Sequence, residues 1–170
     1  MNETPTLDEL LKRCVRSAMH LEMRDTYGYS SPGYRAWRDG VPFDRTAFDA
    51  PWVNLIKETV SRGVVVRRAR IVSEPISDYI RYEHYATPFA NLAGGEMVRW
   101  LPRQKASDLA LPGNDFWLFD GRLVRFGFHS GDGEATGSED SENPAVVKLC
   151  ASAFEAVWER AIDHAEYRPA

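Results

Sequence analysis

The run Val64–Val72, VVVRRARIV, decides the fold class of this chain. It is rich in β-branched residues and is bounded by Gly63 and Pro75, which is typical of a strand at the centre of a sheet. Alternation of side chains along a strand divides it into two faces. One face holds Val65, Arg67, Ala69 and Ile71, and the other holds Val64, Val66, Arg68, Arg70 and Val72. We interpret the run of Arg67, Arg68 and Arg70 as part of a strand that has one side exposed to solvent.

The residues after this run predict a parallel crossover. Ser77 is placed to cap a helix over 78–86, and Thr87-Pro88 indicates a fresh helix start, because the residue before proline avoids the helical region. This second piece should end at Gly94-Gly95. A further strand is expected at Met97–Leu101. Two strands separated by helix favour a parallel connection.

A hairpin follows in the stretch 113–121, GNDFWLFDG. Strands are expected at Phe116–Phe119 and Leu123–Phe128, joined by Asp120-Gly121 or by a loop that includes Arg122. The segment 130–143 is acidic and rich in Gly and Ser, so we expect a mobile loop. Asn143-Pro144 then starts a helix with an apolar face that runs to Ile162. The fold class is therefore α/β, a mixed β-sheet with flanking helices.

The N-terminal part is expected to be helical and irregular. Thr6 and Glu9 form a capping box for a helix that should end near Met19. A short strand is expected over 21–24, a loop over 27–50, and a helix with Pro51 in its first turn. We predict a single domain over 1–170, with an N-terminal helical and loop region (1–63) packed on an α/β core (64–170).

Composition restricts the kinds of protein to which this chain can belong. A chain of 170 residues, 44% hydrophobic, can build a core, and a formal charge of −4 argues against direct nucleic acid binding. Cys14 and Cys150 are expected to be buried free thiols, and no His or Cys spacing predicts a metal site. No signal peptide and no apolar run of about 18 residues is present, so we expect a cytoplasmic protein without membrane attachment. No cofactor is predicted.

The order of strand, helix, strand, hairpin and helix resembles a half-domain of the phospholipase D superfamily. The motif of that family, H-x-K-x-x-x-x-D, provides a nucleophile and a fixed positive charge on phosphate. With its Asp placed on Asp120, its Lys falls on Asp115 and its His on Gly113. This resemblance therefore implies a non-catalytic relative with extra N-terminal helices. The simpler alternative is that Asp120-Gly121 is only a turn.

A ligand site is expected around the polar stretch 78–85, DYIRYEHY, and the strand ends beside it. Its aromatic side chains would wall a pocket, and its charged ones would hold the ligand. The alternative is a buried helix with core tryptophans and solvated arginines. No catalytic residue is assigned. The candidate ligand-binding residues are Arg81, His84, Tyr85, Trp100, Arg103, Asp115, Trp117 and Arg125.

Three longer stretches resemble an actinobacterial family of unknown function, numbered 6879. They are RARIVSEPISDYIRYEHYATPFANLAGGEMVRWLPR, LPGNDFWLFDGRLVRFGFHSGDG and PAVVKLCASAFEAVWERAIDHAEYRP. The resemblance covers nearly the whole chain. It implies a stand-alone protein whose gene lies beside helix-turn-helix regulators and small partner proteins, and it carries over no catalytic residue.

Three hypotheses of function follow. The first is a non-catalytic regulatory protein that acts with a helix-turn-helix transcription regulator, a small partner protein or a second copy of itself as a homodimer. The second is a small-molecule-sensing domain with a pocket near Arg81, His84, Trp100 and Trp117. The third is an enzyme with an unrecognised site built on Asp78, Glu83 and His84.

Overall fold

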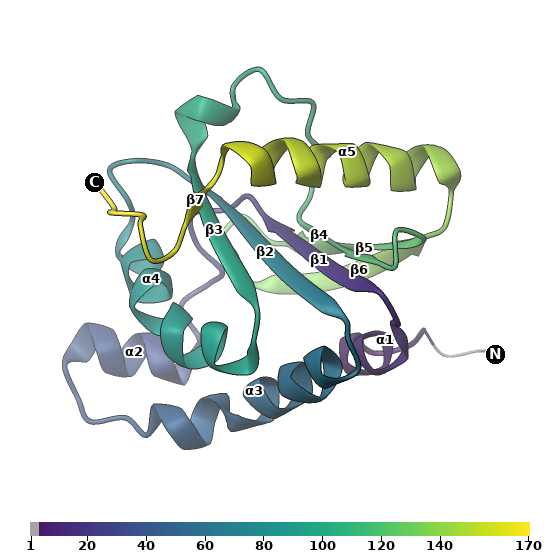
Figure 1. Cartoon of the computed structure of the whole chain (residues 1–170). Coiled ribbons are helices and arrows are strands. Elements are labelled where there is room, and N and C mark those ends of the chain that lie inside the picture. Colours follow the sequence, from purple (N-terminus) through teal and green to yellow (C-terminus); the bar gives the residue numbers. More distant parts are fainter. Residues whose placement is uncertain (1–3) are drawn as a thin grey trace.

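The computed structural model describes residues 4–170. Within them, the strands form one seven-stranded mixed sheet in the order β6-β5-β4-β1-β2-β3-β7 (Figure 1). The strands are β1 (Ser17–Glu22), β2 (Val65–Val72), β3 (Met97–Pro102), β4 (Phe116–Phe119), β5 (Leu123–His129), β6 (Ala135–Ser141) and β7 (Ile162–Asp163). The helices are α1 (Leu7–Arg13), α2 (Pro32–Asp39), α3 (Arg45–Ser61), α4 (Asp78–Ala90) and α5 (Pro144–Arg160), with short 3-10 turns at Leu92–Gly94 and Arg103–Ala106.

The pairing confirms the predicted α/β class and its crossover. Strands β1, β2 and β3 run parallel, and β4, β5 and β6 add an antiparallel meander on one side. The hairpin β4–β5 lies where it was predicted, with a connection of three residues from Asp120 to Arg122. Asp120 and Gly121 both have positive φ, 52° and 64°, which the short side chain of Asp and the absence of one in Gly tolerate.

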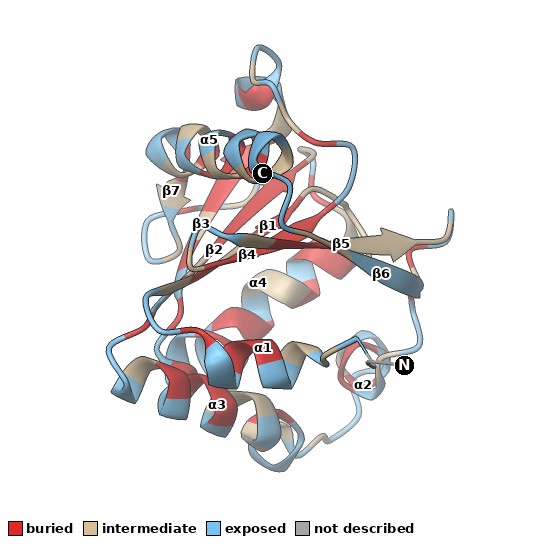
Figure 2. Cartoon of the chain, turned by 90° about the vertical axis from the view of Figure 1, so that its right-hand side faces the viewer, coloured by how far each residue is buried: buried red, intermediate tan, exposed pale blue. Residues whose placement is uncertain are grey.

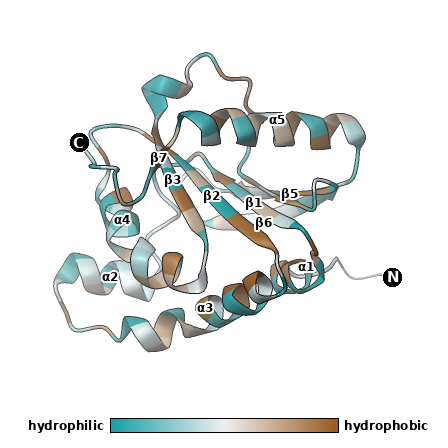
Figure 3. Cartoon of the chain, viewed as in Figure 1, coloured by the Kyte–Doolittle hydropathy of each residue, from teal (hydrophilic) through white to brown (hydrophobic). Residues whose placement is uncertain are grey.

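The two faces of the sheet are covered differently. Helix α5 covers one face, and α1, α3 and α4 lie on the other, with α2 beside them (Figures 1 and 2). The α5 side holds one apolar cluster, whose buried centre includes Ile71, Leu118 and Phe154. The other side has two apolar clusters, one under α1 and α3 and one under α4. Figure 3 shows hydrophilic residues within β2, at the centre of the sheet.

The N-terminal prediction is partly wrong. The capping box of Thr6 and Glu9 is present, but α1 ends at Arg13 because Cys14 adopts an extended backbone. Residues 17–22 then form β1, not the end of a helix, because they pair with β2 on one side and β4 on the other. The expected boundary at residue 63 therefore does not separate the sheet from an N-terminal layer.

Two predicted helix starts at proline are also wrong. The segment 27–50 contains α2 and the first turns of α3, which begins after Asp44 because the carboxylate of Asp44 accepts the N–H of Ala47. Pro51 lies inside that helix. Helix α4 continues through Pro88 to Ala90, and the hydroxyl of Thr87 donates to the Glu83 carbonyl inside it.

The acidic segment 130–143 holds an edge strand where a mobile loop was predicted. Strand β6 pairs with β5, and its residues are largely exposed, so it lacks the apolar alternation that marks a half-buried strand. Helix α5 starts at Pro144 as predicted but ends at Arg160. Ile162 belongs to the short strand β7. No helix among residues 4–170 is long and apolar enough to cross a membrane.

Candidate ligand-binding site

Asp120 acts as an anchor of the fold. Its carboxylate accepts the backbone N–H groups of Val15, Arg16 and Ser17, at the start of β1 and 2.7 to 3.1 Å away. Burial opposes ionisation, but these N–H groups outweigh it and lower the pKa of Asp120. This geometry agrees with the alternative that Asp120-Gly121 is a turn.

The unexpected feature of the structure is a row of charged side chains on the helix-covered face of the sheet. Alternation along β2 places Arg68 and Arg70 on this face, and the parallel register sets Arg70 beside Glu22 of β1. Arg68 is 7% exposed and Arg70 is 4% exposed. The interpretation of these arginines as solvated is therefore wrong. Arg67 points to the other face, where it pairs with Glu155 of α5.

Glu22 joins the two buried arginines. Its Oε1 lies 2.5 Å from Nη1 of Arg68, and its Oε2 lies 2.6 Å from Nε of Arg70. Arg68 also contacts Glu96 at 2.7 Å, and Arg70 contacts Glu83 of α4 at 2.8 Å. We call these five residues the arginine–glutamate network. Its members come from two strands, one helix and the turn before β3.

Electrostatics explain how the network remains charged. Burial disfavours the ionised form of Glu22, but Arg70 and Arg68 outweigh this and lower its pKa well below the ordinary value. The pKa of Glu96 is lowered by Arg68 against the same effect of burial. With all five groups ionised, two arginines face three glutamates, so the network carries one excess negative charge.

His20 lies beside this network on β1. Its ring stacks on Trp117 at 4.3 Å between centroids. Its Nδ1 is 2.8 Å from the Phe116 carbonyl, and its Nε2 is 3.2 Å from Oε1 of Glu22. Because both nitrogens face acceptors, only an imidazolium can donate to both. Neither nitrogen is therefore free to act as a base or nucleophile.

The network opens into a pocket of about 310 Å³, which we call the arginine pocket. Its walls combine guanidinium groups, carboxylates and tyrosine rings. Arg45 and Asp49 of α3 form an ion pair of 2.7 Å at its rim, and Arg45 also donates to the hydroxyl of Tyr82 at 3.1 Å. The lining residues are Glu22, Tyr27, Ser31, Arg45, Phe48, Asp49, Arg68, Arg70, Tyr79, Tyr82, Glu83, Ala86, Ala90 and Asn91.

A second pocket of about 210 Å³ adjoins the first, and we call it the tryptophan pocket. The two share Glu22 and Tyr27 in their walls. The lining residues of the second are Leu7, His20, Glu22, Tyr27, Asp115, Phe116, Trp117, Arg125, Gly127, His129 and Ser138. The face of the sheet under the helices therefore holds two adjacent recesses with a shared wall.

Three of the predicted site residues meet in the tryptophan pocket. Asp115 precedes β4 and is 4% exposed, Trp117 lies on β4, and Arg125 lies on β5. Arg125 holds Asp140 of β6 through two contacts of 2.6 and 2.7 Å. The structure brings these three residues together but separates them from Trp100 and Arg103, with which they were expected to line one rim, and their role in ligand binding stays a prediction.

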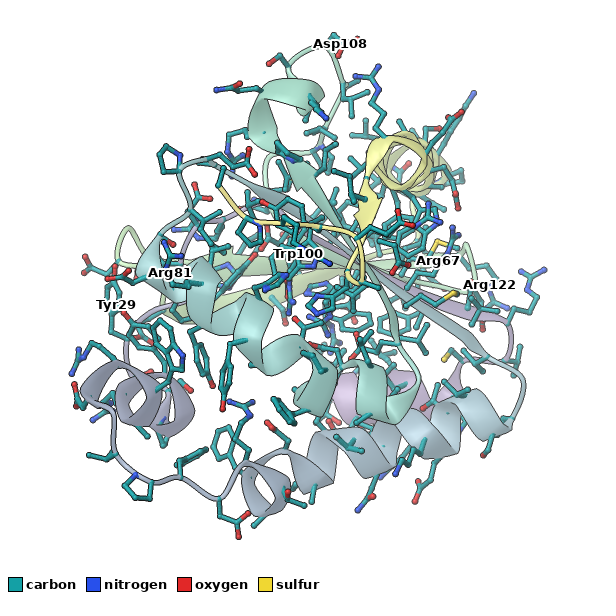
Figure 4. The ribbon with its side chains drawn as sticks, turned by 60° about the vertical axis from the view of Figure 1, so that its left-hand side comes forward. Tyr29, Arg67, Arg81, Trp100, Asp108 and Arg122 are labelled. Carbon is teal, nitrogen blue, oxygen red and sulfur yellow. The ribbon has the colours of Figure 1, made fainter. Side chains whose placement is uncertain are left out.

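The other predicted residues are scattered. Trp100 is fully buried, stacks on Tyr167 and donates to Nδ1 of His164, and His84 packs beside it. Figure 4 shows Trp100 in the interior and Arg81 at the periphery. Tyr85 is also exposed. Arg103 joins strand ends by donating to the Ser73 hydroxyl and the Met23 carbonyl. These residues do not form the expected pocket around Arg81 and His84.

Sequence reasoning missed the centre of the site. Arg68 and Arg70 were noticed but placed in solvent, and Glu22 and Glu96 were not considered. One signal was present: charged residues on one face of a strand interpreted as central are buried, and buried charges need partners. The identity of those partners depends on the register of β1, which the sequence did not indicate.

Strand order and helix layers define a phospholipase D-like α/β fold. The chain is similar to the solved structure of a phospholipase D family member, Nuc from Salmonella typhimurium, with a TM-score of 0.50 and 13% sequence identity. The match covers 95% of this chain and 88% of that chain. At this identity the likeness concerns the fold alone.

Residues 5–169 match the family described as "Domain of unknown function (DUF6879)", and the chain belongs to this family. No curated protein matches the chain. The family resemblance drawn from the sequence is thereby confirmed, whereas the actinobacterial origin stays a prediction.

Proposed function

We propose that this protein is a small-molecule-sensing regulatory domain that binds a polar ligand in the arginine pocket and catalyses no reaction. The observation that carries the proposal is the arginine–glutamate network, buried on one face of the sheet beside an open pocket. The opposite face has an apolar core under α5.

The energetics of buried charge support a role in recognition. Removing charges from water costs several kcal/mol per ion, and well-packed apolar residues of similar volume are often as stabilising as a buried ion pair. A network of this kind is thus weak evidence for a stabilising role alone. The arginine pocket presents guanidinium groups, carboxylates and hydroxyls together, which suits a zwitterionic ligand or one rich in hydrogen-bonding groups. Its volume of about 310 Å³ is at the lower end for small-molecule sites.

Two observations support a function without catalysis. Gly113 and Asp115 stand where the phospholipase D motif would place its His and Lys when its Asp is set on Asp120. His20, beside the network, has both ring nitrogens engaged by acceptors. A nucleophile with a neighbouring base, the usual mark of covalent catalysis, is therefore not formed by this histidine.

Thermal unfolding with a panel of amino acids, nucleotides and organic acids tests the proposal. A ligand at a hundred times its Kd stabilises the fold by about 2.7 kcal/mol through mass action. Arg45→Gln should abolish the shift because it removes the cation at the rim. Arg81→Gln is the matched control, since Arg81 is exposed on the outer side of α4. Equal shifts in both variants, or no shift with any compound of the panel, would contradict the proposal.

A regulatory partner is the second candidate, supported by the exposed aromatic residues of α4 beside Arg45 of α3. Tyr85 and Phe89 are 48% and 50% exposed there, and their rings are 5.7 Å apart. Exposed aromatic residues are enriched where proteins meet. The family resemblance makes a helix-turn-helix regulator the expected partner. Co-purification of the tagged chain from an actinobacterial host should recover it, and a Tyr85→Ser, Phe89→Ser variant should lose it. Light scattering would identify a homodimer instead.

A further inference from the structure

Asp115 is a buried carboxylate that lacks a positively charged partner. It is 4% exposed on the wall of the tryptophan pocket. Its Oδ1 accepts the N–H of Met23 at 2.8 Å, and its Oδ2 accepts the hydroxyl of Tyr27. No ion pair within residues 4–170 includes Asp115. An ionised carboxylate in such a place is costly unless a cation pairs with it.

The cations in the wall of this pocket are engaged elsewhere. Arg125 gives Nε and Nη2 to Asp140, and its Nη2 also donates to the Pro5 carbonyl at 2.6 Å. His20 is held between Phe116 and Glu22. The neighbouring arginine–glutamate network already has one glutamate more than it has arginines. No arginine or histidine in the wall of the tryptophan pocket therefore forms an ion pair with Asp115.

The remaining walls are aromatic. Trp117 of β4 forms one side, with His20 stacked on it, and Tyr27 lies on another, with His129 packed edge-on to it at 5.3 Å. The ring of Phe116 packs in the core on the opposite face of the sheet. Aromatic rings beside a carboxylate are the surroundings that organic cations prefer, because the ring faces and the carboxylate both attract positive charge. The pocket is also more apolar than the arginine pocket in its residue types.

We propose that the tryptophan pocket binds a small organic cation, with its ammonium group paired to Asp115. The proposal rests on the proposed function and deepens it by giving the sensed molecule a positively charged end. The two pockets share Glu22 and Tyr27 in their walls, so a cation bound here lies beside the ligand site of the proposed function.

The electrostatics of Asp115 agree with this assignment. Burial raises the pKa of Asp115 and so favours its neutral carboxyl form. A bound cation would favour the ionised form, so binding should release a proton and strengthen as pH rises through the titration of Asp115. The other titratable groups that line the pocket are His20, Glu22, Tyr27, Arg125 and His129, and Arg24 and Arg103 line a second recess with Asp115.

Three probes of one shape and different charge test the proposal: benzylammonium, benzyl alcohol and benzoate. Calorimetric titration of the full chain should show benzylammonium binding at least tenfold more tightly than benzyl alcohol, with no binding of benzoate. Trp117 fluorescence should change with the cation. The apparent binding enthalpy should depend on the buffer, because a proton is released.

Three variants locate the site. Asp115→Asn should lose tenfold or more in affinity for benzylammonium and leave benzyl alcohol unchanged. Gly127→Val should exclude both, since a Cβ at Gly127 meets only His129 at 3.5 Å and the larger side chain then fills the pocket. Glu159→Gln, an exposed carboxylate on α5, should behave as the wild type.

Equal binding of benzylammonium and benzyl alcohol would overturn the proposal, as would unchanged cation affinity in Asp115→Asn. If Asp115→Asn does not fold, Gly127→Val decides the matter, and retained cation binding in that variant overturns the proposal. The proposed function fails separately, through Arg45→Gln and ligands of the arginine pocket. If benzylammonium binds but no ligand of the arginine pocket is found, the proposed function fails and the tryptophan pocket remains as the ligand site.

Discussion

Replacing Asp120 by Asn, Gly and Ala should destabilise the protein in increasing steps. The carboxylate holds three backbone N–H groups at the start of β1, and the residue has a φ of 52°. Asn keeps one acceptor oxygen and tolerates this φ, so it loses mainly the charge. Gly tolerates the φ but loses every contact, and Ala loses the contacts and is strained as well.

The magnitudes follow from these contacts. Hydrogen bonds to a charged group contribute about 1.5–3 kcal/mol each, but the N–H groups of Val15 and Arg16 are exposed and regain water once the carboxylate is gone. We therefore expect about 1 kcal/mol for Asp120→Asn and about 2–3 kcal/mol for Asp120→Gly. Ala adds a left-handed backbone penalty of about 1–2 kcal/mol, partly offset by a less flexible unfolded chain.

Urea unfolding followed by tryptophan fluorescence measures these differences, and each kcal/mol should lower Tm by about 2–4 °C at this chain length. The pKa of Asp120 is lowered in the folded state, so its contribution is present above the ordinary Asp pKa and is lost as pH falls through the folded value. The gap between wild type and Asp120→Gly should close in acid. Equal stability of the Gly and Ala variants, or a loss below about 0.5 kcal/mol for Gly, would refute the anchoring role.

Three further predictions concern buried groups. Glu22→Gln should cost about 3–5 kcal/mol in urea unfolding, because it breaks the buried ion pairs of one carboxylate with both Arg68 and Arg70, and a loss under about 1 kcal/mol would contradict this. Burial lowers the pKa of His164 from 6.5 to about 4. The free energy of unfolding should therefore fall as the pH drops from 6.5 to about 4, and His164→Gln should make it depend less on pH in this range. Cys150 is fully buried, and burial raises the pKa of its thiol to about 11. Iodoacetamide should therefore modify this thiol only after denaturation. Rapid labelling of the native protein would contradict the packing of α5 on the sheet.

Elements with a strong local signal were predictable from the sequence. The hairpin at Asp120-Gly121, the strand at 65–72 and the helix after Asn143 are each specified by residues within a few positions of one another. The first part of β1, up to Met19, was assigned to a helix because SAMHLE lacks a β-branched residue, whereas a strand was predicted from Leu21. The extended form of the whole segment is fixed by two neighbouring strands. Strand β6 was missed for a similar reason, since its polar residues show no buried face.

The candidate site was less predictable because it depends on register. Asp115, Trp117 and Arg125 were found as polar or aromatic residues near strand ends, and a single hairpin brings them together. The partners of Arg68 and Arg70 lie 46 and 48 positions away at Glu22, and only the parallel pairing of β1 with β2 joins them. The strand predicted over 21–24 contains Glu22, but its pairing with β2 was not predicted, so Glu22 was not recognised as the partner.

The central place of β1 has a consequence for the protein as it is being made. Ala18 pairs with Phe119, about a hundred positions later, so at roughly 5–20 residues per second β1 leaves the ribosome about 5–20 s before that neighbour exists. Its other neighbour, β2, emerges earlier and can pair first. The nascent chain therefore carries a half-finished sheet with one open edge at β1 until β4 closes it. During that interval the unpaired edge of β1 is a segment to which molecular chaperones can bind.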